Sequence, residues 1–565
     1  MDNEGVAGVL EQLADLLEIE GASPFRVRAY RGAARTVGAL ASPVGSLPEK
    51  GAGALEELPG IGKDLAGKIR EIATTGELGL LHELKERTPE SLLSLLEISG
   101  LGPKRAKAIY EGLGIDTIES LEKAAKEGRL RSLKGVGPKL EAQILEGIAA
   151  RALRGKRILL SEADAEIAPI LERLRGADGV GSVEVAGSYR RRRDTVGDVD
   201  ILVTATDRVN EIMKLLTTYD GVIKVLAEGD TKSSVVLRSG LQVDLRVVPP
   251  ESFGAAMHYF TGSKAHNIAI RMLGVRKNLK INEYGVFDQD IRVTGEREED
   301  VFGSVGLSFV PPEMREDRGE IDLAREGKLP TLCTPKDLHG DLVEVSVADH
   351  LDKVVTSLVE GAHARGYGFV VVLGPREMAL AGHEAVRKKF LHAVAHAQAH
   401  AKDVAVLAGV TVDVREDGSL DAADGALDGM AVVRAELSNA HALEEKARTA
   451  RIIAAIESGK VHIVARPTAV FQKEKLAQID AEAIAKAAKK RGVVLELDAR
   501  PERLGSADGY ARVARDVGAK LLVASHATTP DELERVRYGI DQARRGWCAA
   551  KDLANAEKTA KFVKA

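Results

Sequence analysis

The sequence predicts a multidomain α/β protein that is helical at its N-terminus, mixed α/β in its centre and built of alternating strands and helices at its C-terminus. The chain has 565 residues, more than a single hydrophobic core usually spans. Glycine-rich turns separate amphipathic helical segments before residue 150, and alternating strand patterns follow at 185–248. From residue 331 onward, strand and helix patterns alternate as in a parallel sheet or a β/α barrel.

The composition excludes several classes of protein. Hydrophobic residues make up 44% and charged residues 29% of the chain, which is typical of an ordinary globular protein. The two cysteines, Cys333 and Cys548, lack the spacing of a disulfide framework or a zinc site and favour a reducing compartment. No apolar run approaches the ~18 residues that span a membrane, so we expect a cytoplasmic protein. The net charge of −5 means that any nucleic-acid site must be local.

Residues 1–85 are expected to form a small helical domain. Apolar residues recur at helical spacing in 10–21 and again in 25–40, where Arg26 and other arginines are interleaved with Tyr30. Basic and aromatic side chains on one helix suit a phosphate backbone, although a solvated helix face has the same pattern.

Three glycine hairpins follow in the first 150 residues. LPGIGK contains Gly60 and Gly62, and the pattern recurs as SGLGPK (99–104) and KGVGPK (134–139). Such glycines allow a tight turn whose backbone N–H groups point at a DNA phosphate, at the N-terminus of the next helix. One hairpin could be a plain turn, but three indicate DNA binding by shape and charge rather than by base sequence.

The central segment 185–203, VAGSYRRRRDTVGDVDILV, contains the acidic pair Asp198 and Asp200. On a strand these two side chains lie on one face, because the side-chain period is two. Two carboxylates on one face repel each other, and hard oxygen ligands of this kind suit Mg²⁺ or Mn²⁺. The alternative is an exposed edge strand with two solvated aspartates.

A second strand, 241–248 (LQVDLRVV), alternates strictly and places Asp244 on its polar face. Three carboxylates from two strands can hold two cations roughly 3.5–4 Å apart, the spacing used in nucleotidyl transfer. The turn at Gly187 and Ser188 offers backbone N–H groups to a phosphate, with arginines behind it. This order of features predicts a nucleotidyltransferase palm.

GSYRRRR, GDVDILV, VDLRVV and HYFTGSKAHNIAIR (258–271) together resemble the family X DNA polymerases. The resemblance implies a gap-filling, template-directed DNA polymerase of base-excision or break repair, acting as a monomer on 5′-phosphorylated gapped or nicked DNA with a dNTP. It implies two Mg²⁺ or Mn²⁺ ions in the palm and a monovalent cation at the helix-hairpin-helix motifs. The implied domains are 1–85 (small DNA-binding domain), 86–150 (fingers), 151–248 (palm), 249–317 (thumb), 318–330 (linker) and 331–565 (PHP-like domain).

The resemblance also implies roles for individual residues. Asp198 and Asp200 would hold both cations, and Asp244 would join the one at the primer 3′ hydroxyl and serve as its base. The implied nucleotide contacts are Arg157, Gly187, Ser188, Arg191, Gly197, Tyr259, Phe260, Thr261, Gly262 and Asn267. The implied DNA contacts are Arg26, Tyr30, Gly60, Gly62, Gly100, Gly102, Lys104, Gly135 and Gly137.

In some relatives the small domain is a lyase, in which a lysine forms a Schiff base with a 5′-deoxyribose phosphate. Lys68 stands at the matching position, and Arg26 and Tyr30 stand at supporting ones. Asp64 replaces a lysine that is common there, which weakens phosphate binding.

The C-terminal region resembles a PHP phosphoesterase domain, which normally holds three metals for 3′–5′ exonuclease work. Its ligand set is depleted: Gly374-Pro375, Thr411 and Arg466 stand where ligands are expected, and none of these can replace imidazole or carboxylate. His339, Asp341 and His526 remain as candidates for one cation. We therefore expect a structural or DNA-positioning domain without a complete trinuclear centre.

Two other functions fit parts of the sequence. A template-independent nucleotidyltransferase would share the palm, but the hairpins and the YFTGS motif argue against it. A non-catalytic DNA-end scaffold would share the hairpins, but all three palm aspartates are present.

Overall fold

The computed structural model describes residues 3–38, 44, 55–56, 60–89, 91–96, 98, 101–133, 136–154, 157–346, 350–438, 443–465, 479–505 and 507–563. The chain divides into two compact units. One comprises Met1–Arg157, Ala205–Val305 and Glu316–Gly319; the other comprises Ile158–Thr204, Gly306–Arg315 and Glu320–Ala565. None of the described helices is both long and apolar enough to cross a membrane.

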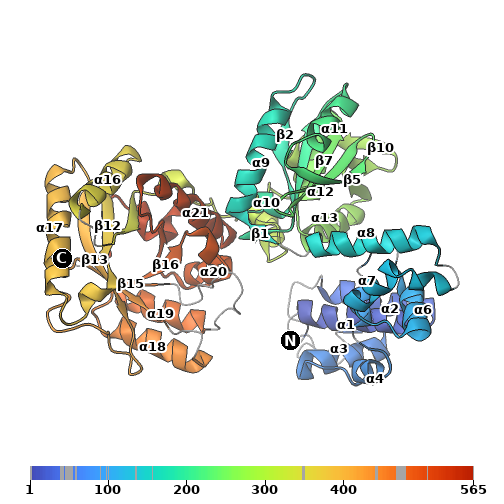
Figure 1. Cartoon of the computed structure of the whole chain (residues 1–565), viewed down its shortest axis with the longest axis horizontal. Coiled ribbons are helices and arrows are strands. Elements are labelled where there is room, and N and C mark those ends of the chain that lie inside the picture. The colour runs from blue at the N-terminus through green and yellow to red at the C-terminus, as the bar shows by residue number, and fades with distance from the viewer. Residues whose placement is uncertain are drawn as a thin grey trace. The chain divides into compact units, whose positions relative to one another are not determined.

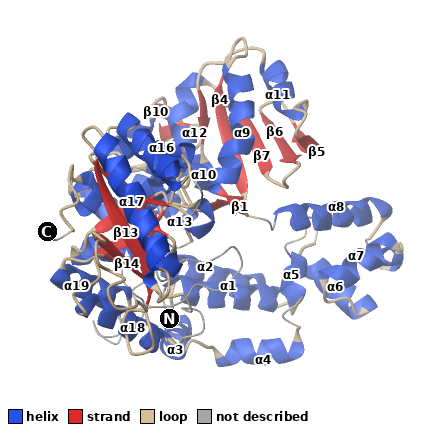
Figure 2. Cartoon of the chain, turned by 60° about the vertical axis from the view of Figure 1, so that its left-hand side comes forward, coloured by secondary structure: helices blue, strands red, loops and turns tan. Residues whose placement is uncertain are grey.

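The described N-terminal residues are helical, as the sequence predicts (Figure 2). Their buried side chains form one continuous hydrophobic cluster that runs from Val6 to Ile148. The glycine hairpins lie directly before three of the helices, since Gly62 caps α3 and Gly102 caps α6, while Gly137 precedes α8. The helices are α1 (Asn3–Ile19), α2 (Pro24–Gly38), α3 (Lys63–Thr75), α4 (Gly79–Arg87), α5 (Leu92–Leu96), α6 (Pro103–Leu113), α7 (Ile118–Lys126) and α8 (Pro138–Arg154).

The central region contains a five-stranded sheet of order β2-β4-β7-β6-β5. β2 pairs antiparallel with β4, with Val185 opposite Ile201, and β6 pairs antiparallel with β7, with Ser234 opposite Asp244. The strands are β2 (Val183–Val185), β4 (Asp198–Thr204), β5 (Val222–Glu228), β6 (Lys232–Leu237) and β7 (Gln242–Val248). β1 (Ile158–Leu159) and β3 (Thr195–Val196) form a separate antiparallel pair, and the helices are α9 (Leu160–Arg175), α10 (Gly187–Arg190) and α11 (Val209–Thr217).

The segment predicted to be a thumb is a small α/β arrangement. Its three strands form an antiparallel sheet of order β10-β9-β8. The elements are α12 (Phe253–Thr261), α13 (Lys264–Arg276), β8 (Leu279–Asn282), β9 (Gly285–Asp288), β10 (Ile291–Thr294) and α14 (Glu298–Ser304), and α15 (Glu320–Arg325) follows.

The C-terminal region is a nearly closed parallel barrel of seven strands in chain order (Figure 1). The main-chain N–H of Glu344 donates to Ala527, so the end of the last strand meets the first. Strand residues alternate between a cluster that includes the surrounding helices and a second, strand-lined cluster, as expected for β/α units. The strands are β11 (Gly340–Glu344), β12 (Phe369–Gly374), β13 (Ala405–Asp413), β14 (Val432–Glu436), β15 (Ile463–Val464), β16 (Val494–Asp498) and β17 (Leu521–Ala524). The helices are α16 (Leu351–Ala364), α17 (Glu384–His400), α18 (Glu445–Glu457), α19 (Ala481–Arg491), α20 (Ala507–Val517) and α21 (Val536–Arg545).

Candidate active site

Strand β4 presents its two aspartates on one face, as its sequence period predicts. Val199 and Ile201 are fully buried, whereas Asp198 is exposed and Asp200 is half-buried. The β-branched and aliphatic residues fix the inward face of the strand, and the acidic residues therefore point the other way.

The turn before β4 requires a glycine. Gly187 has φ +68°, and a Cβ there would lie 3.1 Å from Asp200 Oδ2. The main-chain N–H of Ala186 donates to the carbonyl oxygen of Asp200 at 2.8 Å. The one-turn helix α10, which contains Ser188, is thus held directly against the second aspartate of β4.

Asp244 on β7 is a buried, ionised carboxylate, only 8% exposed. Its Oδ1 accepts a hydrogen bond from Gln242 at 2.9 Å, and its Oδ2 lies 3.0 Å from Lys232 Nζ. Burial raises the pKa of Asp244, but the hydrogen bonds from Gln242, Lys232 and Ser234 outweigh burial and lower it. An ionised oxygen ligand of this kind suits a hard divalent cation.

The YFTG motif ends α12 and is tied to the following helix by Asn267. The Asn267 Nδ2 donates to the carbonyl oxygens of Tyr259 at 2.7 Å and Gly262 at 3.3 Å. A Cβ on Gly262 would lie 2.2 Å from Asn267 Oδ1, so any larger residue there would displace the Asn267 amide. The Phe260 ring packs under the guanidinium of Arg246, 4.3 Å from the ring centre. Thr261 is fully buried.

The other predicted nucleotide contacts differ in exposure. Arg157 is exposed, Ser188 and Gly197 are half-buried, and Arg191 is 9% exposed. All of them are on the turn–strand segment of α10 and β4 except Arg157, which directly precedes β1.

The hairpin glycines leave open space where DNA would approach. At Gly62, Gly102 and Gly137 no described atom lies within 4 Å of an added Cβ, and none of the three has a positive φ. The fold itself therefore does not require glycine there, whereas a phosphate in contact with the backbone would. Gly60 does need its residue type, since its φ is +78°. Lys104 is exposed in the first turn of α6, and Gly100 and Gly135 lie outside the described residues.

The two predicted DNA contacts in the small domain differ in solvent exposure. Arg26 is exposed, but Tyr30 is only 2% exposed and belongs to the hydrophobic core. The structure therefore gives Tyr30 a packing position, in which its hydroxyl interacts with Lys68 rather than facing solvent.

Lys68 is paired with Asp64, one helical turn earlier on α3. Burial lowers the pKa of Lys68, but its hydrogen bond with Asp64 and its further interactions with Tyr30 and Asp64 outweigh burial and raise it. A lysine must lose its proton to act as a nucleophile, so Asp64 opposes Schiff-base chemistry at this position.

Comparisons with known proteins agree with this arrangement. Models of the DNA polymerase beta palm and thumb match residues 157–262 and 256–316, and a helix-hairpin-helix domain and a SAM-like helix-hairpin-helix tandem match 1–78 and 92–150. The DNA polymerase/3′-5′ exonuclease PolX of Bacillus subtilis (strain 168) is 30% identical over 567 residues, covering 98% of both chains. The chain belongs to the family X DNA polymerases.

Two further relatives match about half of this chain. DNA polymerase lambda of Arabidopsis thaliana is 28% identical over 46% of this chain and 53% of its own. DNA polymerase lambda of Rattus norvegicus is 26% identical over 54% of this chain and 55% of its own. Family X enzymes use divalent metals for catalysis and take DNA and dNTP as substrates. The predicted fold class, family and nucleotidyltransferase activity are therefore confirmed.

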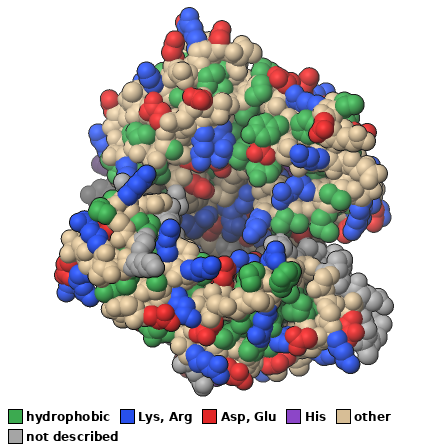
Figure 3. All heavy atoms as spheres, turned by 90° about the vertical axis from the view of Figure 1, so that its right-hand side faces the viewer, with side chains coloured by type: hydrophobic (Ala, Val, Ile, Leu, Met, Phe, Trp, Pro, Cys, Tyr) green, Lys and Arg blue, Asp and Glu red, His purple; other side chains and the backbone are tan. Residues whose placement is uncertain are grey.

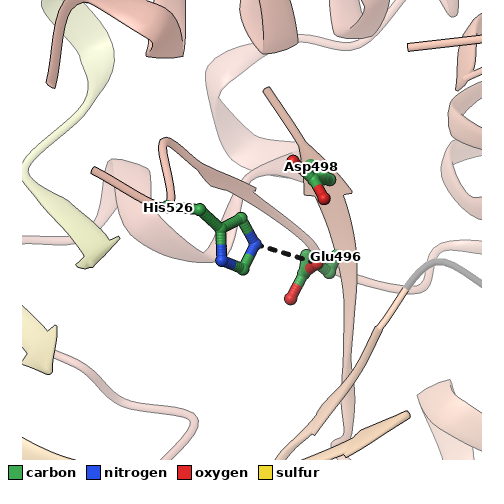
Figure 4. A group of neighbouring side chains, drawn as sticks. All are labelled: Glu496, Asp498 and His526. Carbon is green, nitrogen blue, oxygen red and sulfur yellow. Dashed lines mark hydrogen bonds and ion pairs between the residues drawn. The ribbon is translucent and has the colours of Figure 1, made fainter. Parts of the chain in front are cut away.

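The C-terminal barrel of this family X enzyme gathers carboxylates around His526, which is one of the three predicted candidates. Glu496 and Asp498 on β16 and His526 after β17 form the only cluster of three or more metal-type ligands among the described residues (Figure 4). His339 and Asp341 are not part of it. Asp341 is buried, accepts main-chain N–H groups from Leu342 and Ser525, and has its pKa raised to about 6 by burial. The pair in LELD has the same spacing as DVD, which is a signal that sequence reasoning missed.

Arginines already fill this cluster. Glu496 accepts two hydrogen bonds from Arg434, at 2.5 and 2.9 Å, and both oxygens of Asp498 accept from the guanidinium group of Arg500, the shortest contact being 2.6 Å. The two ring nitrogens of His526 lie 2.8 Å from Glu344 and 3.1 Å from Glu496. The carboxylate oxygens that could bind a metal are already paired with guanidinium and imidazole groups. The described residues therefore do not fit a trinuclear metal centre.

A wider ring of ion pairs completes the network. Glu436 lies 3.1 Å from Arg434 and 3.6 Å from Arg376, which also lies 3.5 Å from Asp413. Arg503 lies 3.9 Å from Asp498 and 4.0 Å from Glu436. Each carboxylate of this network therefore has a fixed arginine within ion-pair distance. Arg466, which stands where another ligand is expected, lies outside the described residues.

Proposed function

We propose that Asp198, Asp200 and Asp244 bind two divalent cations, Mg²⁺ or Mn²⁺, and that the enzyme fills short gaps during base-excision or break repair. The observation that carries this proposal is the sheet order, in which β4 and β7 are neighbours and supply the three carboxylates. The ionised state of Asp244 and the glycine that Asp200 requires at position 187 support it.

When bound, two such cations lower the pKa of a primer 3′ hydroxyl and neutralise the charge on a leaving pyrophosphate. Asp244 then accepts the hydroxyl proton as the candidate base. The 3′ oxygen attacks the α-phosphorus in line, the bond to the bridging oxygen breaks, and pyrophosphate leaves. Asp198 and Asp200 would hold the two cations from β4.

Two sets of residues bind the nucleotide in this proposal. Ser188, Arg191 and Arg157 contact the triphosphate, helped by the backbone N–H groups of the turn at Gly187. Gly197 keeps the backbone clear beside the aspartates. The sugar and base are contacted by Tyr259, Phe260, Thr261, Gly262 and Asn267.

The hairpins hold the DNA backbone on either side of a gap, with the small domain at a 5′ phosphate. The open space at their glycines supports this role. Lys and Arg lie among Asp and Glu on the face drawn in Figure 3, so the DNA contacts in this proposal are local ones such as the hairpins. The proposal includes a monovalent cation at the hairpins and a monomeric enzyme. It also includes a cytoplasmic location, in keeping with two free cysteines, and domain boundaries after residues 85, 150, 248, 317 and 330.

A 5′-deoxyribose-phosphate lyase activity at Lys68 is a second part of the proposal. Family membership and the position of Lys68 beside Tyr30 favour it, while the ion pair with Asp64 slows it. Borohydride trapping that is unchanged in Lys68→Ala would exclude Lys68 as the nucleophile.

The test is primer extension on a duplex with a one-nucleotide gap, with and without a 5′ phosphate, in Mg²⁺ and in Mn²⁺. We expect one templated nucleotide to be added by the wild type and none by Asp200→Ala, with the 5′ phosphate raising the rate. Tight binding of gapped DNA without extension in either metal would instead identify a DNA-end scaffold. Untemplated extension of a single strand would identify a template-independent transferase.

Omitting nucleotides tests the barrel in the same assay. We expect no shortening of the primer, because arginines occupy the candidate ligands. Metal-dependent shortening that persists in Asp200→Ala would show a working nuclease in the barrel.

A further inference from the structure

The turn that carries Ser188 and Arg191 leaves α10 through a strained residue. Arg192 has φ +55°, in the left-handed region that a non-glycine residue adopts at a cost of order 1 kcal/mol. Such a conformation persists only where surrounding groups hold it. The entry of the turn is held by Asp200, through the main-chain bond from Ala186.

The exit of the turn is held by α21, a helix of the C-terminal barrel. Arg545 Nη1 donates to the carbonyl oxygen of Arg191 at 2.9 Å, and Gln542 Nε2 donates to the carbonyl oxygen of Arg192 at 3.2 Å. Asp541 Oδ2 lies 3.1 Å from Arg192 Nε. The three side chains come from two consecutive turns of α21 and contact two consecutive residues, Arg191 and Arg192.

These three α21 residues are buried although they are polar. Asp541 is 7%, Gln542 1% and Arg545 4% exposed. A buried polar side chain is destabilising unless it is hydrogen-bonded or ion-paired. Gln542 and Arg545 donate hydrogen bonds to the turn, and Asp541 is ion-paired with it. Their polarity is therefore explained by what they hold.

A second set of contacts joins the same turn to the same helix through α9. Asp164 accepts hydrogen bonds from Tyr189 on α10, at 2.5 Å, and from Tyr538 on α21, at 3.1 Å. Arg537 lies 3.3 Å from the same carboxylate. One aspartate of α9 thus links both elements.

The helix α21 is itself firmly fixed in the barrel. Its Ile540 and Ala543 belong to the hydrophobic cluster between strands and helices, and Arg545 is paired with Asp508 of α20 at 2.9 Å. Its neighbour Arg544 is bound to Glu313 at 2.7 Å and to the carbonyl oxygen of Cys333 at 2.8 Å. Movement of α21 relative to the turn would break several buried polar contacts at once.

We propose that Asp541, Gln542 and Arg545 of the barrel are positioning residues for nucleotide binding, holding the Gly187–Arg192 turn so that Ser188 and Arg191 face the triphosphate. This inference rests on the proposed role of Ser188 and Arg191. It gives the metal-poor barrel a task in polymerisation that needs no metal ligand. The proposal concerns dNTP binding, because α21 contacts the turn that carries Ser188 and Arg191.

The test compares variants on one helix. Gln542→Met removes the donor to Arg192 with little change in volume, Gln542→Glu places a carboxylate against that carbonyl oxygen, and Arg545→Met removes the donor to Arg191. Arg544→Met is the matched control, because it breaks a half-buried arginine contact of the same helix that does not touch the turn. For each variant, KM and kcat for the dNTP and Kd for gapped DNA are measured.

We expect Gln542→Met to raise KM for the dNTP about three- to tenfold, and Gln542→Glu and Arg545→Met to raise it at least about tenfold. The value of kcat and the Kd for DNA stay within about twofold of wild type, as do all three constants in Arg544→Met. Hydrogen–deuterium exchange at residues 187–193 rises in the first three variants and not in the control, and this second readout does not depend on catalysis.

Equal KM values in the turn-facing variants and in Arg544→Met, with the proteins folded, would overturn the proposal. So would faster exchange at 187–193 without a change in KM, because the turn would then be held but not used for the nucleotide. A wild type that adds no nucleotide fails differently, since it removes the polymerase function for control and variants alike.

Discussion

Two strands of this molecule carry the same acidic pattern and have opposite surroundings. On β4, Asp198 is exposed and Asp200 lies against the backbone of a glycine turn. On β16, Glu496 and Asp498 are buried, 0% and 2% exposed, and each is held by the guanidinium group of an arginine. The spacing of two carboxylates on a strand places them on the same face. The neighbouring residues determine whether a bound metal ion or an arginine side chain balances their charge.

The negative charges of Glu496 and Asp498 in the barrel are already balanced by arginine side chains. A guanidinium group forms a planar, two-pronged contact with a carboxylate, and a divalent ion could enter only by displacing it. Displacement would leave a buried arginine without a partner, which is strongly unfavourable. We therefore interpret the β16 cluster as structural and the β4 cluster as catalytic.

The largest effect that would sharpen this comparison is the removal of one charge from β4. Asp198→Asn should reduce extension of a gapped primer by at least about 10³-fold, because one carboxylate of the proposed metal pair is lost. It should also reduce the number of Mn²⁺ ions bound, measured by electron paramagnetic resonance. Glu184→Gln, on the exposed face of the adjacent strand β2, is the control for charge removal and should retain both properties. Full activity in Asp198→Asn would contradict the catalytic interpretation.

The next largest effect is expected in the barrel, on stability. Arg434→Met leaves Glu496 buried without its two-pronged partner and should lower the free energy of unfolding by about 3–5 kcal/mol. Unfolding can be followed by the fluorescence of Trp547, the single tryptophan of the chain, which is 2% exposed in the barrel region. The double variant Arg434→Met/Glu496→Met should recover most of the loss, since it removes both charges. A single variant as stable as wild type would mean that the pair is not the counterion system described above.

The sequence predicted features that depend on neighbouring residues, but not contacts between residues far apart in the chain. The period of two placed Asp198, Asp200 and Asp244 on polar strand faces, and the glycine hairpins lie at helix starts as predicted, because these features depend on neighbouring residues. The pairing of Arg434 with Glu496 joins two strands 62 residues apart, and no spacing within either strand reveals it. The contact of α21 with the Arg191 turn spans 354 residues and was equally hidden.

Burial also separated predictions that look alike in sequence. Arg26 and Tyr30 share a basic, aromatic helix segment, yet Arg26 is exposed and Tyr30 is part of the core. His339 and Asp341 have the spacing expected of ligands from the first barrel strand, yet they lie at the start of β11 and neither belongs to the cluster around His526. Which side of a helix or strand end faces the core is set by tertiary packing, which the period alone does not give.

A smaller effect tests whether His526 is a fixed cation of the barrel cluster. Burial lowers the pKa of His526, but Asp498, Glu496 and Glu344 outweigh burial and raise it from 6.5 to about 9. Because the folded state binds this proton more tightly, the stabilisation is complete below pH 6.5 and is lost as the pH rises through about 9. The loss is up to about 3 kcal/mol. Urea unfolding at both ends of this range should show the decline in wild type and not in His526→Gln, and equal slopes in the two proteins would exclude the protonated histidine.

The smallest effect concerns a third fixed counterion, Asp64, which pairs with Lys68 in the small domain. Asp64→Asn should lower the pKa of Lys68, so that a larger fraction of its amine is unprotonated and nucleophilic at neutral pH. Because Asp64 is 79% exposed and water screens its charge, we expect only a roughly two- to fivefold rise in borohydride-trapped product on a 5′-deoxyribose-phosphate substrate. Asp64→Asn/Lys68→Ala is the control and should trap nothing above background. A rise of the same size in that double variant would assign the nucleophile to another lysine. No rise in Asp64→Asn would show that the ion pair does not hold Lys68 in its protonated form.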